Sequence, residues 1–196
     1  MRRTLMGLVV VAAVSLGLPA AAHAQDSSSG SGSAMRSSGG LLDSDTHTRK
    51  HMLSGFLLAP YDYGFGLGLA LRYDLPLVHD GFIGKLNDSF SLEMGGDLYY
   101  AWYGYYGGSY GYLNVVVPAV EARWTFHFTP QWEAYGKAGV GFRWRRFSDD
   151  YGPRIRAIDW FYWNVAVGGL FNVTERLALR AELGYGGIRL GVGLAF

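Results

Sequence analysis

Apolar and polar side chains alternate with a period of two along most of the chain after residue 52. In seven runs, large aliphatic or aromatic residues take every second position, and small, polar or charged residues lie between them. Successive side chains of a β-strand point to opposite faces of a sheet, so each run predicts a strand with one apolar and one polar face. The seven predicted strands cover residues 65–75, 90–102, 116–128, 132–144, 161–173, 177–185 and 188–196.

An eighth, weaker strand is predicted over Met52–Ala59. After the first 24 residues no apolar stretch is long enough for a spanning helix, but most runs hold about 9–14 residues, enough for tilted strands to cross a bilayer. The pattern predicts an all-β fold, an eight-stranded antiparallel up-and-down transmembrane β-barrel. The alternative is a soluble two-sheet sandwich or lipocalin-like barrel with its apolar faces inward, which leaves the Tyr- and Trp-rich rims unexplained.

The energetics of burial decide which face of the predicted barrel meets lipid. A Lys or Arg on the lipid face near the midplane costs roughly 2–4 kcal/mol. Several charged residues fall in the middle of strands on the polar face: Asp97, Glu121, Lys137, Arg180 and Glu182. Turning all of them toward hydrocarbon would cost more than a typical domain stability of about 5–15 kcal/mol. We therefore expect the apolar face to point outward.

The predicted connections have an asymmetry that is typical of such barrels. Small outer-membrane barrels have short periplasmic turns and longer loops outside. Counting back from the carboxyl end makes 129–131 and 174–176 short periplasmic turns, and it places the long connections 103–112 and 146–160 on the opposite side. Two connections are exceptions, a tight outer link at 186–187 and a long inner one at 76–88.

The amino-terminal region predicts export. Residues 1–24 have the pattern of a signal peptide: Arg2 and Arg3, an apolar stretch, Pro19, and a small-x-small cleavage site that ends at Ala24. A permanent transmembrane helix is the alternative, against which the proline and the cleavage pattern argue. Residues 25–50 begin with a Ser/Gly-rich stretch and predict a flexible periplasmic tail. The barrel is then expected over residues 51–196.

Residues 52–196 resemble the small eight-stranded outer-membrane barrels of the OmpA and OmpX type. The most specific part is the last strand, IRLGVGLAF, which resembles the terminal assembly signal of such proteins through Leu190, Val192, Leu194 and Phe196. The resemblance implies a Gram-negative outer membrane. It also implies lipid and lipopolysaccharide, periplasmic chaperones and the barrel assembly machinery as partners. Peptidoglycan anchoring is not implied, because the chain lacks a globular periplasmic domain.

Charged residues on the inward face are the main candidate for a functional feature. The strongest candidates for a lumen network are Asp97, Glu121, Arg123, Lys137, Arg180 and Glu182, and further inward charges are Arg72, Asp74, Glu93, Glu133, Arg143 and Arg189. An eight-stranded interior is just wide enough for side chains to fill, so these charges predict a paired polar plug. A gate whose ion pairs exchange partners to admit small ions is the alternative.

The remaining composition excludes several functions. With 17 basic and 16 acidic side chains, the chain has no field that attracts nucleic acid. No cysteine is present to form a disulfide or to carry a lipoprotein anchor. His47 and His51 have the spacing of a helical metal pair, but no third ligand is near, so we expect neither a metal nor a cofactor.

An enzyme is possible in this fold, because a lipid A palmitoyltransferase and a lipid A deacylase are barrels of the same size. Their catalysis uses His with Ser facing the outer leaflet. Here the histidines fall in the tail or near the periplasmic rim, and the fragment His127-Phe128-Thr129 contains no Ser. We therefore expect no catalytic site.

A tyrosine-rich connection is the most distinctive predicted surface feature, with Tyr103, Tyr105, Tyr106, Tyr110 and Tyr112. Tyrosine offers amphipathic contact area at low entropic cost, so this loop could bind another surface, a polysaccharide or a phage. The alternative is that it extends the aromatic girdle at the lipid headgroups. The sequence as a whole predicts a monomeric barrel with a structural or surface-interaction role. A narrow gated channel and a lipid A-modifying enzyme are the alternatives.

Overall fold

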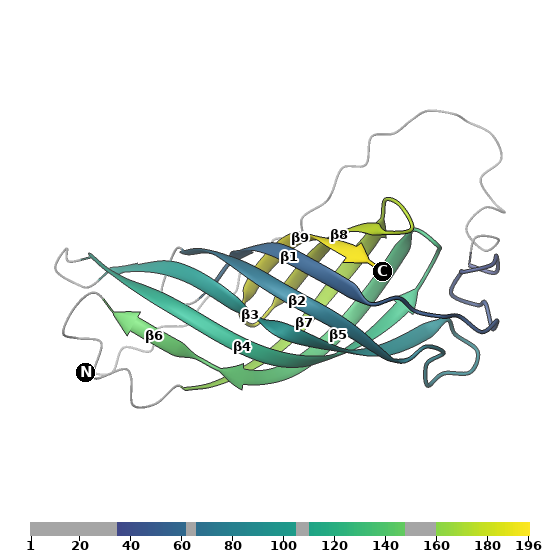
Figure 1. Cartoon of the computed structure of the whole chain (residues 1–196), viewed down its shortest axis with the longest axis horizontal. Helices are drawn as coiled ribbons and strands as arrows, with labels where there is room; N and C mark the ends of the chain where they lie inside the picture. Colours follow the sequence, from purple (N-terminus) through teal and green to yellow (C-terminus); the bar gives the residue numbers. More distant parts are fainter. Residues whose placement is uncertain (1–34, 62–65, 105–109, 148–159) are drawn as a thin grey trace, which may run out of the picture.

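The computed structural model describes residues 35–61, 66–104, 110–147 and 160–196, and these residues form a closed antiparallel β-barrel (Figure 1). The strand segments are β1 (Met52–Ala59), β2 (Gly66–Val78), β3 (Asp88–Gly104), β4 (Tyr110–His127), β5 (Trp132–Phe142), β6 (Trp144–Phe147), β7 (Phe161–Asn172), β8 (Leu177–Gly184) and β9 (Gly187–Ala195). No helix in these ranges is long and apolar enough to cross a membrane.

Segments β5 and β6 are two parts of one barrel strand. Both pair with β4 in the same register, because Ala119 pairs with Gly141 and Val116 pairs with Trp144. Between these pairs lies Pro118, which has no N–H to donate to the ladder. The strand is interrupted at Arg143, whose own N–H donates to the carbonyl of Trp160 at 2.8 Å. The described segments therefore make eight strands.

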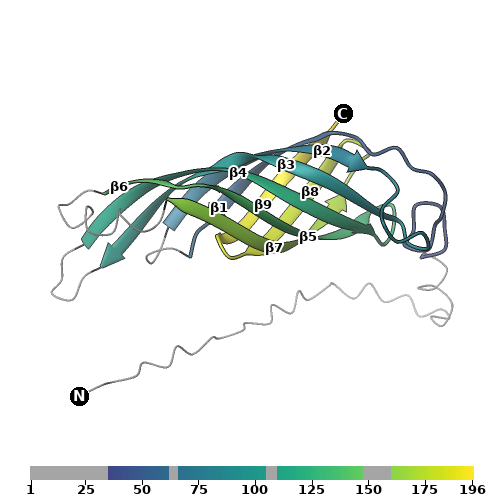
Figure 2. The same ribbon diagram turned by 90° about the horizontal axis from the view of Figure 1, so that it is seen from below.

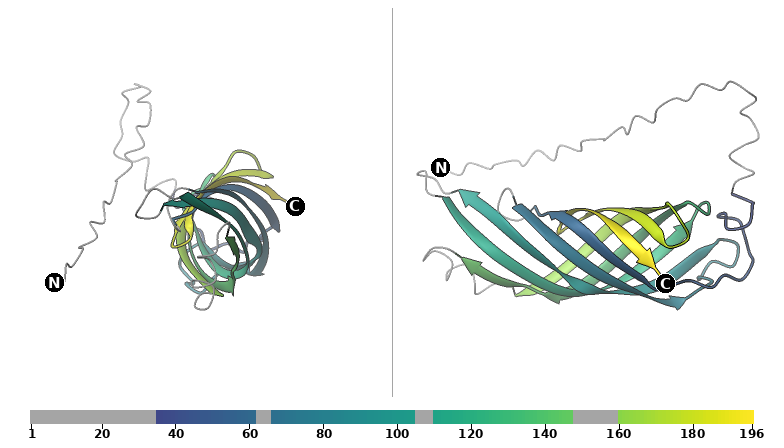
Figure 3. Two further views of the ribbon diagram at one scale, coloured as in Figure 1. Left: turned by 90° about the vertical axis from the view of Figure 1, so that its left-hand side faces the viewer. Right: turned by 45° about the horizontal axis from the view of Figure 1, so that its top comes forward.

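Each strand pairs with its neighbour in the chain, and the last strand returns to the first. The order along the wall is β3-β2-β1-β9-β8-β7-β5-β4, and pairing of β3 with β4 closes the ring. Seen along its axis the wall forms a continuous ring of strands (Figure 3). The predicted all-β, eight-stranded, antiparallel up-and-down barrel is confirmed, including its first strand at Met52–Ala59.

The barrel is apolar outside and charged inside. Along β2 the burial alternates residue by residue, so Leu69 is 60% exposed whereas Arg72 is 0% exposed. The same inversion holds on β9, where Leu190 is exposed and Arg189 is fully buried. The apolar faces therefore point outward, as predicted, and the sandwich or lipocalin-like alternative is wrong.

One barrel end, called here the turn end, carries two short turns and the carboxyl terminus. Thr129 Oγ1 accepts hydrogen bonds from the N–H groups of Gln131 and Trp132 at 3.3 and 3.0 Å. Thr174 Oγ1 accepts in the same way from Arg176 and Leu177 at 3.2 and 3.0 Å. A threonine that caps its own turn explains why both connections are tight. The predicted turns at 129–131 and 174–176 are confirmed.

The other end, called here the hairpin end, differs from expectation. Strands β3 and β4 have 17 and 18 residues, and with β6 they extend beyond the rest of the wall (Figure 2). Pairing continues from Trp102–Tyr112 to Gly104–Tyr110. The predicted loop 103–112 was therefore too long, because cross-strand pairing continues through this glycine-rich segment, where the alternation is weak.

The remaining connections also shift slightly. Strand β2 continues to Val78 through an irregularity after Pro76, so the predicted inner connection 76–88 shortens to 79–87. The link between β8 and β9 is Tyr185-Gly186 rather than 186–187, because Gly184 pairs with Gly187. Strand β6 continues to Phe147, and residues 148–159 of the predicted loop 146–160 lie outside the described residues.

Residues 35–50 lie against the turn end instead of forming a free tail. The N–H of Leu41 donates to the carbonyl of Phe128 at 3.3 Å, and the carbonyl of Leu41 accepts from Asn87 at 2.8 Å. The N–H of His47 donates to Asp80 Oδ1 at 2.9 Å. The prediction of a flexible tail is wrong for this part, because the 79–87 connection offers partners that composition does not reveal. Residues 1–34, including the predicted signal peptide, lie outside the described residues.

Candidate functional site in the barrel interior

Ten charged side chains fill the middle of the barrel and are almost completely buried. Five are cations, Arg72, Arg123, Lys137, Arg180 and Arg189, and five are carboxylates, Asp74, Glu93, Asp97, Glu121 and Glu182. We call these ten residues the lumen network. They come from the inward positions of β2, β3, β4, β5, β8 and β9. Their formal charges cancel.

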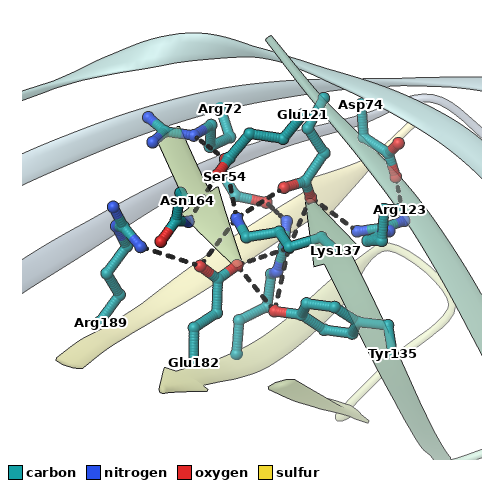
Figure 4. A network of polar contacts seen from close by, with 12 residues as sticks. Ser54, Arg72, Asp74, Glu121, Arg123, Tyr135, Lys137, Asn164, Glu182 and Arg189 are labelled. Carbon is teal, nitrogen blue, oxygen red and sulfur yellow. Dashed lines mark hydrogen bonds and ion pairs between the residues drawn. The ribbon is translucent and has the colours of Figure 1, made fainter. Parts of the chain in front are cut away.

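Glu93 and Lys137 connect the two halves of the lumen network. Glu93 Oε1 accepts from Arg123 Nη1 at 2.9 Å and from Arg180 Nη2 at 2.6 Å. Lys137 Nζ donates to Glu93 Oε2 at 3.0 Å and to Glu121 Oε2 at 3.0 Å, and it lies 2.9 Å from Glu182 Oε2. Figure 4 shows Lys137 between Glu121 and Glu182. Each of these two central groups therefore faces three opposite charges.

The outer members of the lumen network are paired as well. Arg72 donates through Nε to Glu121 Oε2 at 2.9 Å and through Nη2 to Asp97 Oδ1 at 2.7 Å. Arg189 Nη2 donates to Asp97 Oδ2 at 2.6 Å. Arg123 also pairs with Asp74. Every carboxylate of the network thus contacts at least one cation.

Neutral polar side chains make further hydrogen bonds to the charged groups of the lumen network. The Tyr135 hydroxyl donates to Glu182 Oε1 at 2.7 Å and accepts from Arg180 Nη2 at 3.1 Å. Asn164 Nδ2 donates to Glu121 Oε1 at 2.6 Å, and Arg180 Nη1 donates to Ser54 Oγ at 2.8 Å. Sequence reasoning missed Ser54, Tyr135 and Asn164. Their inward position on the alternating strands was the available signal.

The structure brings all six predicted lumen residues into this one network: Asp97, Glu121, Arg123, Lys137, Arg180 and Glu182. It adds Glu93 as a central member, which the sequence placed on the inner face without singling it out. A charge taken out of water loses several kcal/mol of solvation, and only close opposite charges and hydrogen bonds offset that loss. The pairing explains how ten charges can occupy a narrow interior.

Apolar side chains lie on both sides of the lumen network. Toward the hairpin end a buried cluster consists of Leu58, Tyr99, Ala101, Val115, Val117, Ala119 and Tyr162. Toward the turn end Tyr135, Leu170 and Ala178 form a smaller cluster, with Met52 packed against it. Leu58, Ala101, Val115 and Val117 are at most 1% exposed. A hydrated path along the axis would have to pass the larger cluster at the hairpin end.

A polar cavity of about 470 Å³ opens at the turn end, and we call it the vestibule. Its lining includes Arg49, Ser89, Arg123, His127 and Glu133. The sequence showed no Ser next to His127 in the chain. The structure places Ser89 there from the neighbouring strand, with its Oγ 2.9 Å from His127 Nε2.

The predicted assembly-signal residues lie on the outer face of β9. Leu190, Val192 and Leu194 point outward, and Phe196 is 67% exposed. The Phe196 ring stacks on the His51 ring, with the two centroids 6.3 Å apart. The backbone N–H of Phe196 also donates to the backbone carbonyl of His51 at 3.0 Å. The terminal strand is therefore fixed on both sides, by β1 and by β8.

The other candidate residues are placed as follows. Tyr103, Tyr110 and Tyr112 belong to strands β3 and β4, whereas Tyr105 and Tyr106 lie outside the described residues. The Tyr73 hydroxyl and His51 Nδ1 lie 2.9 Å apart, so His51 has a partner in the barrel wall. In the described ranges no group of three or more potential metal ligands comes together.

No protein-family model matches the chain, and neither does any curated protein. Among solved structures, a transmembrane β-barrel designed de novo is similar to it. That structure is 13% identical, covers 78% of this chain and 100% of its own, and has a TM-score of 0.45. The assignment of this chain to closed eight-stranded barrels rests on its own strand pairing.

Proposed function

We propose that the chain is an outer-membrane protein that crosses the membrane as an eight-stranded barrel, with a closed interior and a structural or surface-interaction role. The observation that carries this proposal is the charge-balanced lumen network, with a buried apolar cluster beside it toward the hairpin end. Such an interior would stabilise the barrel from inside, and the apolar cluster at the hairpin end would block a continuous hydrated path.

The outer surface supports the membrane assignment. Exposed leucines and valines cover the middle of the wall, among them Leu57, Leu69, Leu71, Leu98, Val120, Val140, Val165, Val167, Leu183 and Leu190. Exposed aromatic residues lie at its two margins, with Phe82, Trp132 and Phe196 at the turn end and Trp102, Trp144, Trp160, Phe161 and Tyr185 at the hairpin end. An apolar band between two aromatic girdles is typical of transmembrane barrels.

In this role the barrel would have a defined orientation in the membrane and a defined set of partners. With short turns and the carboxyl terminus on the periplasmic side, the turn end faces the periplasm and the hairpin end faces outward. Residues 1–24 would direct export, and the last strand would be read by periplasmic chaperones and the barrel assembly machinery. Outer-membrane lipid and lipopolysaccharide would surround a monomer, and the tyrosine-rich hairpin would be the surface offered to other partners.

Single-channel recording separates this proposal from a narrow gated channel. Purified full-length protein in planar lipid bilayers should give no reproducible openings under conditions in which a porin control conducts. Reproducible openings that disappear in the variants Lys137→Met and Glu121→Gln would support the channel and contradict closure. Gel mobility of outer-membrane fractions tests the location. A faster band without boiling indicates a closed barrel, whereas recovery in the soluble periplasm would refute the membrane assignment.

A further inference from the structure

Three side chains in the vestibule form a chain of hydrogen bonds that the lumen network does not explain. Ser89 lies at the start of β3, His127 at the end of β4 and Glu133 at the start of β5. Ser89 Oγ lies 2.9 Å from His127 Nε2, and His127 Nδ1 lies 3.3 Å from Glu133 Oε1. His127 and Glu133 are a cross-strand pair, and Ser89 pairs with Thr125, two residues before His127.

The order of these contacts favours one tautomer of His127. A carboxylate at Nδ1 holds the imidazole proton on that nitrogen, which leaves Nε2 as an acceptor for the serine hydroxyl. Asn172 Nδ2 donates to the same Oε1 of Glu133 at 2.9 Å and so holds the carboxylate in place. Nucleophile, base and orienting carboxylate are thus in hydrogen-bond sequence, the arrangement that activates a serine.

The site is sheltered but open to the vestibule. Ser89 is 8% exposed and His127 is 6% exposed, and both line the cavity of about 470 Å³. That volume lies within the usual range for small-molecule sites, roughly 300–1,000 Å³. A substrate could therefore reach the hydroxyl from the turn end without passing through the lumen network.

Cations line the same cavity. Arg49 and Lys50 belong to the docked amino-terminal segment, and Arg123 reaches the vestibule from β4. The Nε of Arg123 is buried and has no hydrogen-bond partner in the part of the chain that the structure describes. The positive charge of Arg123 is already balanced by Asp74 and Glu93, so Arg49 and Lys50 are the cations of this lining that remain to attract an anionic group.

We propose that Ser89, His127 and Glu133 form a catalytic site for hydrolysis of a carboxylic ester whose anionic group binds near Arg49 and Lys50. Met52, which also lines the vestibule and packs against the buried cluster of Tyr135, Leu170 and Ala178, offers an apolar contact for the acyl chain. This activity is independent of the closed lumen and would be exposed to the periplasm in the proposed orientation.

The reaction balances with water as the second substrate. Ser89 Oγ bonds to the ester carbonyl carbon, and its proton passes to His127 Nε2. The bond to the alcohol oxygen then breaks, and His127 returns the proton to the leaving alcohol. Water, deprotonated by His127, attacks the acyl-serine. The serine–acyl bond breaks, the carboxylic acid leaves, and Ser89 regains its proton.

The test uses folded full-length protein in detergent with a fluorophosphonate probe and with 4-nitrophenyl butyrate. The wild type should be labelled, with mass spectrometry placing the adduct on Ser89, and should hydrolyse the ester. Ser89→Ala and His127→Gln should each reduce the hydrolysis rate by at least about 100-fold, as expected for loss of nucleophile or base. Ser91→Ala, at the next inward position of the same strand, should stay within about twofold of wild type.

Two results would overturn the proposal. One is an absence of both labelling and hydrolysis in wild-type protein that shows the mobility shift of a folded barrel. The other is an adduct on a residue other than Ser89. The mass-spectrometric assignment is made on the wild type, so it decides the matter even if a variant fails to fold.

The substrate class has its own test. Replacing Arg49 and Lys50 together by Gln should raise the KM for 4-nitrophenyl succinate, which carries an anionic group, by about tenfold. It should leave the KM for the neutral 4-nitrophenyl butyrate unchanged. Equal effects on both esters would contradict recognition of an anionic group while leaving the serine assignment intact.

Discussion

Nη2 of Arg180 lies 2.6 Å from Oε1 of Glu93, although 87 positions separate the two residues in the chain. Arg180 is on β8 and Glu93 is on β3, and β9, β1 and β2 lie between them along the wall. The contact therefore crosses the barrel interior. Pairs of this kind tie opposite sides of the wall together and make the lumen network a structural element.

Replacing Glu93 by Gln should strongly destabilise the barrel. The substitution keeps the shape of the side chain but removes the negative charge that faces Arg123, Lys137 and Arg180. Loss of one partner from a buried ion network costs about 3–5 kcal/mol, because the remaining charges stay buried without compensation. Urea titration of protein folded in lipid vesicles would measure the change in the free energy of unfolding.

The matched control for this substitution is Glu175→Gln. Glu175 is exposed in the turn between β7 and β8. An exposed charge contributes at most about 1 kcal/mol, so this variant should unfold with nearly wild-type stability. Equal stability of both variants would show that the lumen network does not hold the barrel.

If the barrel spans a membrane as proposed, a lysine on its outer face should cost free energy according to its depth in that membrane. Leu71 and Leu77 both lie exposed on β2, with Leu71 near the middle of the wall and Leu77 at the turn end. Leu71→Lys should reduce the free energy of unfolding in vesicles by about 2–4 kcal/mol, and Leu77→Lys by about 0–1 kcal/mol. A larger loss for Leu77→Lys would place the membrane differently along the barrel.

Gly187 should tolerate no side chain. Its φ is +135°, and a Cβ there would lie 2.4 Å from the carbonyl oxygen of Ala59. We expect Gly187→Ala to lose about 1–3 kcal/mol from backbone strain, with a further loss from the displaced β1 end. Gly55→Ala is the control, since no atom lies within 4 Å of its added Cβ. Thermal loss of the fast-migrating gel band would compare the two, and similar midpoints would refute the strain argument.

Acid should loosen the docked amino-terminal segment through Asp43. The N–H groups of Gly39 and Asp45 donate to its carboxylate, at 2.5 and 3.0 Å, and hold the pKa of Asp43 below its ordinary value. A carboxyl with a lowered pKa stabilises the fold above the unfolded-state pKa, and this contribution is lost as pH falls through the folded-state pKa. A carbon-13 NMR titration should give a lower pKa in the folded protein than in urea. An equal or higher folded-state pKa would contradict these hydrogen bonds.

The sequence by itself determined the strands, their inner and outer faces, and the two turns capped by Thr129 and Thr174. Alternation is a local property, since each residue of a strand faces either the outer surface or the lumen. A charge turned toward lipid costs several kcal/mol. That cost decides which alternate positions of a strand face inward. On this basis the sequence placed Asp97, Glu121, Lys137 and the other lumen charges on the inner face correctly, without any knowledge of their partners.

Only the tertiary structure decided which side chains meet. Sliding one strand past its neighbour by two residues preserves the period-two pattern but changes every cross-strand pair. The alternation of apolar and polar residues therefore does not determine the register of the strands. The contact of Glu93 with Arg180, the approach of Ser89 to His127 and the extension of the β3–β4 hairpin all depend on that register. The docking of residues 35–50 depends equally on long-range partners such as Asn87, since a polar composition alone offers no core to bury.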